Sequence, residues 1–330
     1  MIRALFAVRK RTAFLLAFAA IAVSIDMTGQ GARAEDYPSR IVNLVVAFPA
    51  GGGVDTVGRV VAQKLTEALG QQVIVVNRPG AGSVIGTRDV AKATPDGYTL
   101  LLLVTGAGLP SNPGYDMGKD FAPISLIASV PIVIMANPSV PVKNLQDVIA
   151  LAKKDGDKVT VGTPPAPTLN YFGAEQFKAI TGTNITIVSY KGTGPLTNDL
   201  VGGHVMLAFN TLPPAIGNIQ AGKLRAIAVG SPQRMAAIPD VPTIAESGVK
   251  DLEIVQYYGL VAPTGTPQPI IDKLNTELRK IVSSEDMKKR LLDAGGDPLP
   301  STPAEYATNI AREEGKWQAV IKKLGLVITY

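Results

Sequence analysis

The stretch that decides the fold runs from Ile41 to Leu69 and reads IVNLVVAFPAGGGVDTVGRVVAQKLTEAL. Ile41–Phe48 is a mostly apolar run with the length of a buried strand, and Pro49–Gly53 break it. After the glycines, apolar residues return at helical spacing, at Val57, Val60, Val61, Leu65, Ala68 and Leu69. A buried strand followed closely by an amphipathic helix predicts the start of a parallel α/β sheet.

The same alternation continues along the chain. Strands are predicted at Gln72–Val76, Tyr98–Val104, Val159–Gly162, Ile185–Ser189, Val205–Phe209, Leu224–Val229 and Ile254–Ala262. Helices are predicted at Ile85–Ala93, from Asn144 onward as an N-cap, and at Pro267–Val282, Glu285–Ala294 and Pro303–Leu324. The fold class is therefore α/β, with helices that connect parallel strands.

Two passages suit chain crossings between domains, one near Ala136–Pro141 and one near Gln256. A chain of this length is too long for one small core, so two domains are the default. The crossings predict a first domain made of 35–137 and 256–330, with 138–255 inserted as the second domain.

The first 34 residues have the order of a secretory signal. Arg3, Arg9, Lys10 and Arg11 precede the apolar run Thr12–Val23, and Ala32-Arg33-Ala34 offers a cleavage site. The run is short for a span of roughly 20 residues, although an uncleaved anchor is the alternative reading. The sequence therefore predicts export to the periplasm and a mature chain that starts at Glu35.

The basic character of the chain belongs largely to that signal. The whole chain has 32 Lys and Arg against 27 Asp and Glu, but residues 1–34 hold five basic groups and only one acidic group. The mature chain is thus nearly neutral, so a nucleic-acid partner is not indicated. The absence of cysteine excludes disulfides and thiolate chemistry, and a single histidine, His204, excludes clustered histidine ligands. We expect no metal and no cofactor.

Two loops could bind an anion. Gly51–Gly53 joins a buried strand to a helix, where backbone N–H groups and the helix dipole favour negative charge. Gly162–Thr168 leads into a second helix, with Thr168 as its N-cap. If the two helix ends face each other across a cleft, they could hold one carboxylate. The plainer alternatives are a tight turn at the glycines and a simple cap at Thr168.

Motifs spread over the chain resemble the Bug family, the extracytoplasmic solute receptors of tripartite tricarboxylate transporters. They are YPSR at 37–40, FPAGGGVD at 48–55, NRPGAG at 77–82, PDGYTLL at 95–101, KDFAP at 119–123, YKG at 190–192, DLVGG at 199–203, AGKLR at 221–225, PDVPT at 239–243 and GLVAP at 259–263. They cover nearly all of the mature chain in the expected order.

The resemblance implies a two-domain periplasmic binding protein fold, similar to type II, with the ligand in a hinged interdomain cleft. The ligand-binding residues that it implies are Phe48, Ala50, Gly51, Gly52, Asp55, Asn77, Thr105, Thr163, Thr168, Tyr171, Asn210 and Tyr257. Three of these depart from the family pattern, in which His, Asp and Trp often stand at the positions of Tyr171, Asn210 and Tyr257. Two phenols and an amide at the distal end would suit an acid whose far end is neutral or aromatic.

The expected function is that of a monomeric receptor, without enzymatic activity, that delivers a small organic carboxylate to the membrane permease of such a transporter. A protein that presents its ligand to a signalling receptor is the alternative. A periplasmic hydrolase is a third reading, but the chain has no G-x-S-x-G elbow and His204 lies in a turn before a strand. The identity of the carboxylate does not follow from the sequence.

The mature protein is expected to begin at Glu35, because Ala32-Arg33-Ala34 follows the apolar run at a suitable distance. Intact-mass measurement of protein released from the periplasm tests this. A mass that retains residues 1–34 would contradict cleavage.

Overall fold

The computed structural model describes residues 37–106 and 113–326. The predicted signal and its cleavage site lie outside the described residues. The chain divides into 1–37 and 38–330, and the fold described below is that of 38–330.

A parallel core forms the first sheet region. β1 (Val42–Val46) lies between β2 (Val73–Asn77) and β3 (Thr99–Val104), and both neighbours are parallel to it. β9 (Val255–Pro263) is antiparallel to β3 and separates it from β4 (Phe121–Ala136), whose outer edge carries the short β10 (Asp297–Pro298). The strand order here is β2-β1-β3-β9-β4.

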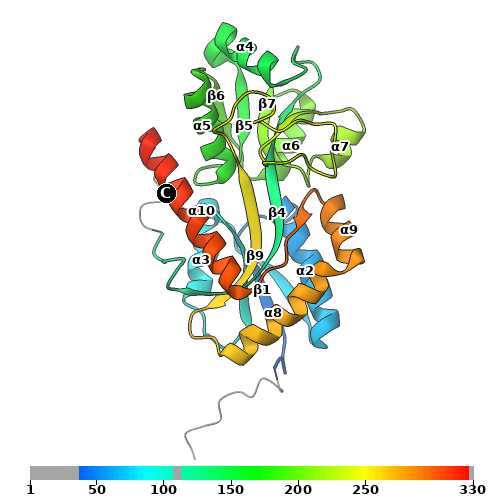
Figure 1. The fold of residues 1–330 in the computed structure, drawn as a ribbon, viewed down its shortest axis with the longest axis vertical. Helices are drawn as coiled ribbons and strands as arrows, with labels where there is room; N and C mark the ends of the chain where they lie inside the picture. Colours follow the sequence, from blue (N-terminus) through cyan, green and yellow to red (C-terminus); the bar gives the residue numbers. More distant parts are fainter. Residues whose placement is uncertain (1–36, 107–112, 327–330) are drawn as a thin grey trace, which may run out of the picture. The chain divides into compact units, whose positions relative to one another are not determined.

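β4 joins this region to a second sheet region (Figure 1). Its residues from Phe121 to Pro131 pair with β9, whereas Ile132–Ala136 pair with β7 (Leu207–Thr211) and largely with β8 (Arg225–Val229). β5 (Thr160–Thr163) lies parallel between β7 and β6 (Thr186–Ser189). β4 therefore changes partner between Pro131 and Ile132. The domain limits themselves stay a proposal.

The sequence analysis missed β4. Pro123 and Pro131 interrupt its apolar run, and proline is rare inside central strands because it cannot donate to the ladder. The structure accommodates Pro123 at a register shift against β9, and Pro131 at the point where β4 changes partner. Both prolines therefore mark irregular positions of one long strand rather than its ends.

Helices cover both regions. Around the first lie α2 (Gly53–Leu69), the 3-10 turn η2 (Ala81–Ser83), α3 (Val84–Ala91), α8 (Gln268–Ser283), α9 (Glu285–Asp293) and α10 (Pro303–Leu324). Around the second lie α4 (Leu145–Asp155), η3 (Gly156–Lys158), α5 (Leu169–Thr181), α6 (Thr193–Gly202) and α7 (Ile216–Gln220). The predicted bounds of α10 are those of the structure, where a capping box between Thr302 and Glu305 fixes its start.

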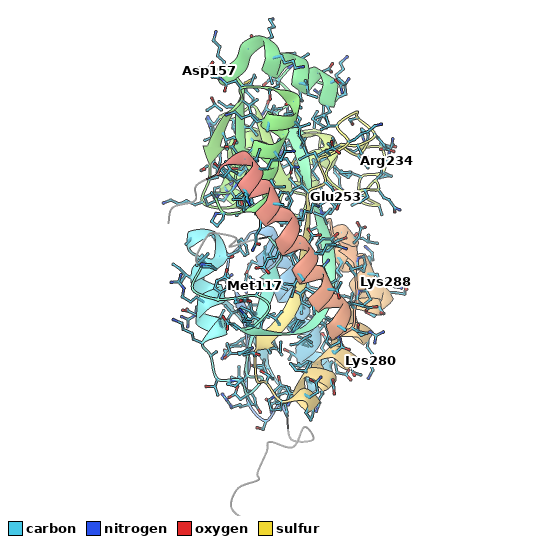
Figure 2. The ribbon with its side chains drawn as sticks, turned by 60° about the vertical axis from the view of Figure 1, so that its left-hand side comes forward. Met117, Asp157, Arg234, Glu253, Lys280 and Lys288 are labelled. Atoms are coloured by element: carbon cyan, nitrogen blue, oxygen red, sulfur yellow. The ribbon has the colours of Figure 1, made fainter. Side chains whose placement is uncertain are left out.

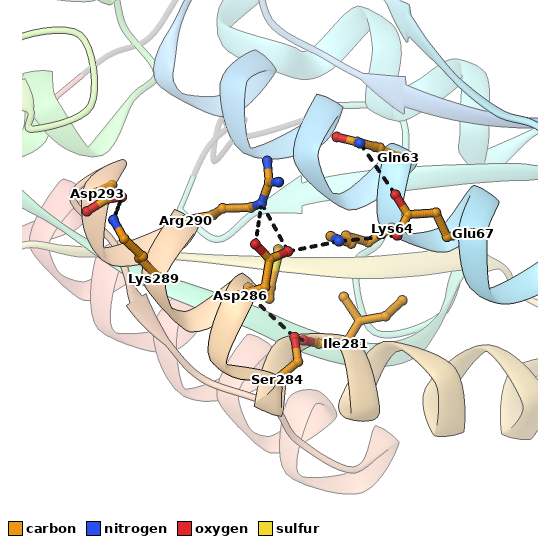
Figure 3. A network of polar contacts seen from close by, with 10 residues as sticks. Gln63, Lys64, Glu67, Ile281, Ser284, Asp286, Lys289, Arg290 and Asp293 are labelled. Carbon is orange, nitrogen blue, oxygen red and sulfur yellow. Dashed lines mark hydrogen bonds and ion pairs between the residues drawn. The ribbon is translucent and has the colours of Figure 1, made fainter.

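Ion pairs connect α2 to α9 on the surface (Figure 3). Lys64 of α2 lies 2.8 Å from Asp286, which also pairs with Arg290 one turn along α9. Half-exposed pairs of this kind contribute little, on the order of 0–1 kcal/mol. α2 is held mainly by its buried face, which includes Val57, Val61 and Leu65.

α10 packs against both sheet regions (Figure 2). Tyr306 and Ile310 belong to the core beside β3 and β9, whereas Trp317 belongs to the core of the second region. Trp317 is fully buried and stacks on Phe172 of α5 with ring centroids 6.3 Å apart. The first turns of α10 therefore pack against the first sheet region and its last turns against the second.

Among the described residues, no helix has the length and apolar character that a membrane crossing requires.

Two glycine variants test the packing between α10 and the sheet. A Cβ on Gly259 of β9 would overlap the buried Tyr306 ring, whereas one on Gly315, on the exposed side of α10, would meet no atom within 4 Å. We expect Gly259→Ala to lower the free energy of unfolding by about 1–3 kcal/mol. Gly315→Ala should raise it by about 0.5–1 kcal/mol. Denaturant titrations of both variants check this, and equal effects would contradict the packing.

Candidate functional site

A cavity of about 60 Å³ lies where the loops of the two sheet regions meet. The residues around it are Phe48, Pro49, Ala50, Gly52, Gly53, Val54, Pro164, Thr168, Asn170, Gly192, Thr193, Gly194, Pro195, Thr211, Gln256 and Tyr258. None of them carries a charge at neutral pH. The polar groups that face the cavity are therefore hydroxyls, side-chain amides and backbone groups.

Three helix N-termini converge on this cavity. Gly52, Thr168 and Gly192 are the N-caps of α2, α5 and α6, and all three line it. None of these ends has a side-chain cap, which is also true of α3, α7 and α8, whereas α4, α9 and α10 are capped by Asn144, Ser284 and Thr302. Uncapped helix N-termini present free N–H groups and positive partial charge. Together they form an anion-binding site without a charged side chain.

The α2 end lies very close to the opposite wall. A Cβ on Gly52 would lie 3.2 Å from Thr193 Oγ1, and one on Gly53 would lie 3.2 Å from Thr211 Oγ1. A side chain at the second or third glycine of the triplet would thus displace a threonine side chain by a few tenths of an ångström.

The buried carboxylate of Asp55 holds the loop that precedes α2. It accepts hydrogen bonds at 2.9 Å from the Gly51 N–H, from Arg59 Nε and from Asn77 Nδ2. Asn77 also donates to the Phe48 carbonyl at 3.1 Å, which ties the end of β2 to the end of β1. Burial by itself would raise the pKa of Asp55, but the hydrogen bonds from Arg59, Gly51 and Asn77 outweigh it and hold that pKa below its ordinary value.

This network gives Gly51, Asp55 and Asn77 a positioning role. The Gly51 N–H is already bonded to Asp55, so it is not free for a ligand. Gly51 has a φ of +80°, and a Cβ there would meet no atom within 4 Å, so backbone conformation is what requires glycine.

Asn210 positions the α6 end in the same way. Its Nδ2 donates to the Thr193 carbonyl at 3.3 Å and to Thr197 Oγ1 at 3.0 Å, while its Oδ1 accepts from the Thr211 N–H at 2.9 Å. The side chain is fully buried and does not line the cavity. A carboxylate at this position could not donate the two hydrogen bonds that the amide makes.

Side chains along β9 point alternately to its two faces, and this decides which of them reach the cavity. Gln256 and Tyr258 line it, whereas Tyr257 between them projects from the other face of the strand. The Tyr258 hydroxyl donates to Gln256 Oε1, and Gln256 Nε2 donates to Asn170 Oδ1, both at 3.1 Å. Asn170 Nδ2 in turn donates to the Phe209 carbonyl at 3.0 Å. This chain of hydrogen bonds fixes the orientation of both amides.

Tyr257 belongs instead to the surroundings of α10. Its ring lies under the Arg312 guanidinium at 5.5 Å, and burial, followed by the Glu313 carboxylate, raises its pKa. Thr105 Oγ1 accepts from the Tyr257 N–H at 3.0 Å, so it supports β9. Tyr171 packs edge-on against Phe172 on α5.

Two buried threonine hydroxyls in this part of the chain have no hydrogen-bond partner, those of Thr163 and Thr211. Thr211 is 2% exposed and lines the cavity, whereas Thr163 is fully buried and does not. An unsatisfied buried hydroxyl destabilises the protein, so an orphan in a cavity wall marks a place for a ligand group.

Of the residues predicted to bind a ligand, Phe48, Ala50, Gly52 and Thr168 line the cavity. Gly51, Asp55, Asn77 and Asn210 hold its walls, and Thr105, Thr163, Tyr171 and Tyr257 do not line it. Ligand binding by any of them stays a prediction. The sequence analysis missed Asn170, Thr193, Thr211, Gln256 and Tyr258. Two features of the sequence could have identified some of them. One is the motif at Tyr190–Gly192 just before α6, and the other is the alternation of side chains along β9.

Within the described ranges, no group of three or more acidic, histidine or cysteine side chains is placed to hold a metal ion. His204, in the turn between α6 and β7, does not line the cavity.

Known proteins are similar to this chain over most of its length. A sequence model described as "Tripartite tricarboxylate transporter family receptor" matches residues 57–326. Protein BugT of Bordetella pertussis is 34% identical over 317 residues, which is 94% of this chain and 97% of BugT.

Solved structures agree with the fold. R. palustris Rpa4515 with adipate is 33% identical with a TM-score of 0.84, covering 88% of this chain and 99% of that one. MatC from Rhodopseudomonas palustris with bound malate is 30% identical with a TM-score of 0.81, covering 86% of this chain and all of that one. These likenesses confirm the predicted α/β two-domain periplasmic binding protein fold.

The role of Asp55 predicts a pH dependence of stability. A carboxyl whose pKa is lowered by folding contributes stability above its unfolded pKa of about 4, and that stability is lost as the pH falls through the folded pKa. Asp55→Asn should be less stable than wild type at pH 7 and should lose less stability between pH 5 and pH 3. Denaturant titrations across this range measure both effects.

Asp157→Asn is the matched control, because Asp157 is exposed on η3 (Figure 2). Equal pH profiles for wild type and Asp55→Asn would show that the carboxylate does not hold the loop.

Proposed function

The chain belongs to the family of tripartite tricarboxylate transporter receptors, and we propose that it binds a small organic carboxylate in the cavity between its two sheet regions. The observation that carries this proposal is the convergence of three uncapped helix N-termini on one uncharged cavity. Helix ends of this kind favour an anion, and a carboxylate has the acceptor oxygens that several N–H donors need.

The neutral lining also supports a receptor rather than an enzyme. A carboxylate bound by backbone N–H groups and hydroxyls is stabilised without a residue placed to attack it or to exchange a proton with it. Among the polar residues of the wall, Gln256, Asn170 and Tyr258 are engaged with one another. Binding is thus non-covalent and the ligand leaves unchanged.

Enclosure of the ligand depends on both sheet regions. Gly52 and Gly53 come from the first, whereas Thr168, Thr193 and Thr211 come from the second. A carboxylate that touches both walls favours the arrangement in which they are close, and so shifts the population toward a closed state. Ligand-bound structures of the adipate and malate proteins, at 33% and 30% identity, support the ligand class.

Delivery to the membrane permease of a tripartite transporter is the proposed outcome of binding, by a monomeric protein located in the periplasm. The family description supports this role. Presentation of the ligand to a signalling receptor is the alternative. Uptake of labelled ligand by cells that lack the protein separates the two, because only delivery makes uptake depend on it.

Two isosteric variants test the cavity. Thr211→Val removes the orphan hydroxyl that lines it, and Thr163→Val removes the one that does not. We expect Thr211→Val to weaken binding of a carboxylate such as adipate or malate by about 1.5–3 kcal/mol, tenfold or more in Kd. Its stability should be unchanged or higher, because a buried unpaired hydroxyl is lost.

Titration calorimetry on both variants gives the comparison. Thr163→Val should bind as wild type does. If Thr163→Val weakens carboxylate binding and Thr211→Val does not, the ligand does not bind in this cavity. The binding site would then lie among the residues predicted from the sequence.

A further inference from the structure

α10 belongs to both sheet regions and is one continuous helix (Figure 1). Its first half is anchored by Tyr306, which is fully buried, and by Ile310, both in the core beside β3 and β9. Its second half is anchored by Trp317, which is fully buried in the core of the second region. Burial of these large side chains fixes each half of the helix to its own region.

The contacts of α10 change from one region to the other within three residues. The Glu314 carboxyl lies near Asp116, in the segment that leads into β4, and burial followed by this like charge raises its pKa. Lys316, two residues further on, lies 3.4 Å from the Glu253 carboxylate instead, in the segment that leads from the second region into β9. Gly315, the residue between them, therefore marks the crossing.

The packing of the protein does not require glycine at position 315. The residue is exposed, and a Cβ built on it would meet no atom within 4 Å. The glycines inside α2, α3 and α5 differ, because a Cβ on Gly58, Gly86 or Gly173 would lie 2.9, 2.5 or 2.4 Å from a neighbouring atom.

Glycine inside a helix is less favourable than alanine, because it leaves the backbone more conformational freedom. α10 contains no other glycine, and its one proline, Pro303, stands at its start, where proline is tolerated. The intrinsic preference for helix along α10 is therefore lowest at Gly315, where its contacts pass from one region to the other.

We infer that Gly315 is a joint in α10, at which the helix bends when the two sheet regions move apart. Residues 303–314 then stay with the first region and residues 316–324 with the second, so Tyr306 and Trp317 keep their buried contacts. A few backbone positions can absorb the rotation of a domain movement in this way. The inference rests on the closure proposed above, because it says how a helix that belongs to both regions permits that movement.

The residue at position 315 should therefore set the balance between a straight and a bent helix. Alanine is the suitable replacement, since it favours helix and its Cβ has free space. It should stabilise the arrangement of the structure, in which α10 is helical on both sides of the joint. The difference in helix propensity between glycine and alanine corresponds to a shift of about three- to fivefold in the ratio of the two arrangements.

Single-molecule energy transfer in the ligand-free protein tests the joint. Because the chain has no cysteine, dyes can be attached through Asp157→Cys and Lys280→Cys, at exposed sites of the second and the first region (Figure 2). We expect two dye separations in the otherwise unchanged protein, one of which matches the structure. Gly315→Ala should raise the population of that one about three- to fivefold relative to the other.

Two controls separate the joint from helix stability. The double variant Gly315→Ala with Ala319→Gly keeps the composition of α10 and moves the glycine about one turn along, to an exposed position beyond Trp317. It should shift the populations as Gly315→Ala does, although its free energy of unfolding should be near that of wild type. Gly217→Ala, in α7, also adds a Cβ that meets no atom within 4 Å, and it should leave the populations unchanged.

Each contrary result has its own meaning. One narrow separation in the otherwise unchanged protein would overturn the joint together with the proposed closure. Unchanged populations in Gly315→Ala, an equal shift in Gly217→Ala, or a return to wild-type populations in the double variant would overturn the joint and leave the closure standing. The joint is judged without ligand, so failure of adipate and malate to change the dye separation would count against the proposed function and not against the joint.

Discussion

The carboxylate of Asp55 is the constraint on which the site depends. It lies 3% exposed at the start of α2 and bonds to three partners from the loop, the helix and the end of β2. These bonds fix the path of Pro49–Gly53 and thereby the direction in which the first N–H groups of α2 point. Because the carboxylate is already satisfied, its charge stabilises the loop without entering the cavity, where it would repel an anion.

The proposed binding site, without charged side chains, would have a physical advantage for a protein that is stable both with and without its ligand. A buried lysine or arginine would need a partner whenever the ligand is absent, and an unpaired buried charge is costly. Helix N-termini carry only partial charge and are fixed by their own hydrogen bonds. The walls around Gly52, Thr168 and Gly192 therefore need little reorganisation between the two states.

Local patterns in the sequence predicted much of this arrangement, because they depend on neighbours along the chain. The strand-loop-helix at Ile41–Leu69 and the limits of α10 follow from hydrophobic period and capping residues. β4 could not be predicted in this way, because its prolines are tolerated only through its pairing with β9. Tyr257 was placed in the site although strand alternation gives the cavity to Gln256 and Tyr258 instead.

The remaining residues around the cavity could not be predicted without knowledge of the sheet topology. Thr193 and Thr211 are ordinary residues at the start of a helix and the end of a strand, and nothing local distinguishes them. They face Gly52 and Gly53 because β4 joins the two sheet regions and brings their loops together. Asp55 and Asn77 were predicted to bind the ligand and do lie beside the cavity, but their side chains point into the loop that they hold.

α10 adds a constraint on any hinge that opens the cavity. If the regions turned only about β4 and β9, Trp317 would have to leave the core that it shares with Phe172, at a cost of several kcal/mol. Between the apolar contacts of Ile310 and Trp317, Asn309 and Glu313 each have a buried oxygen without a hydrogen-bond partner in the described part of the chain. β4 and α10 thus each belong to both regions, one through strand pairing and the other through its buried face.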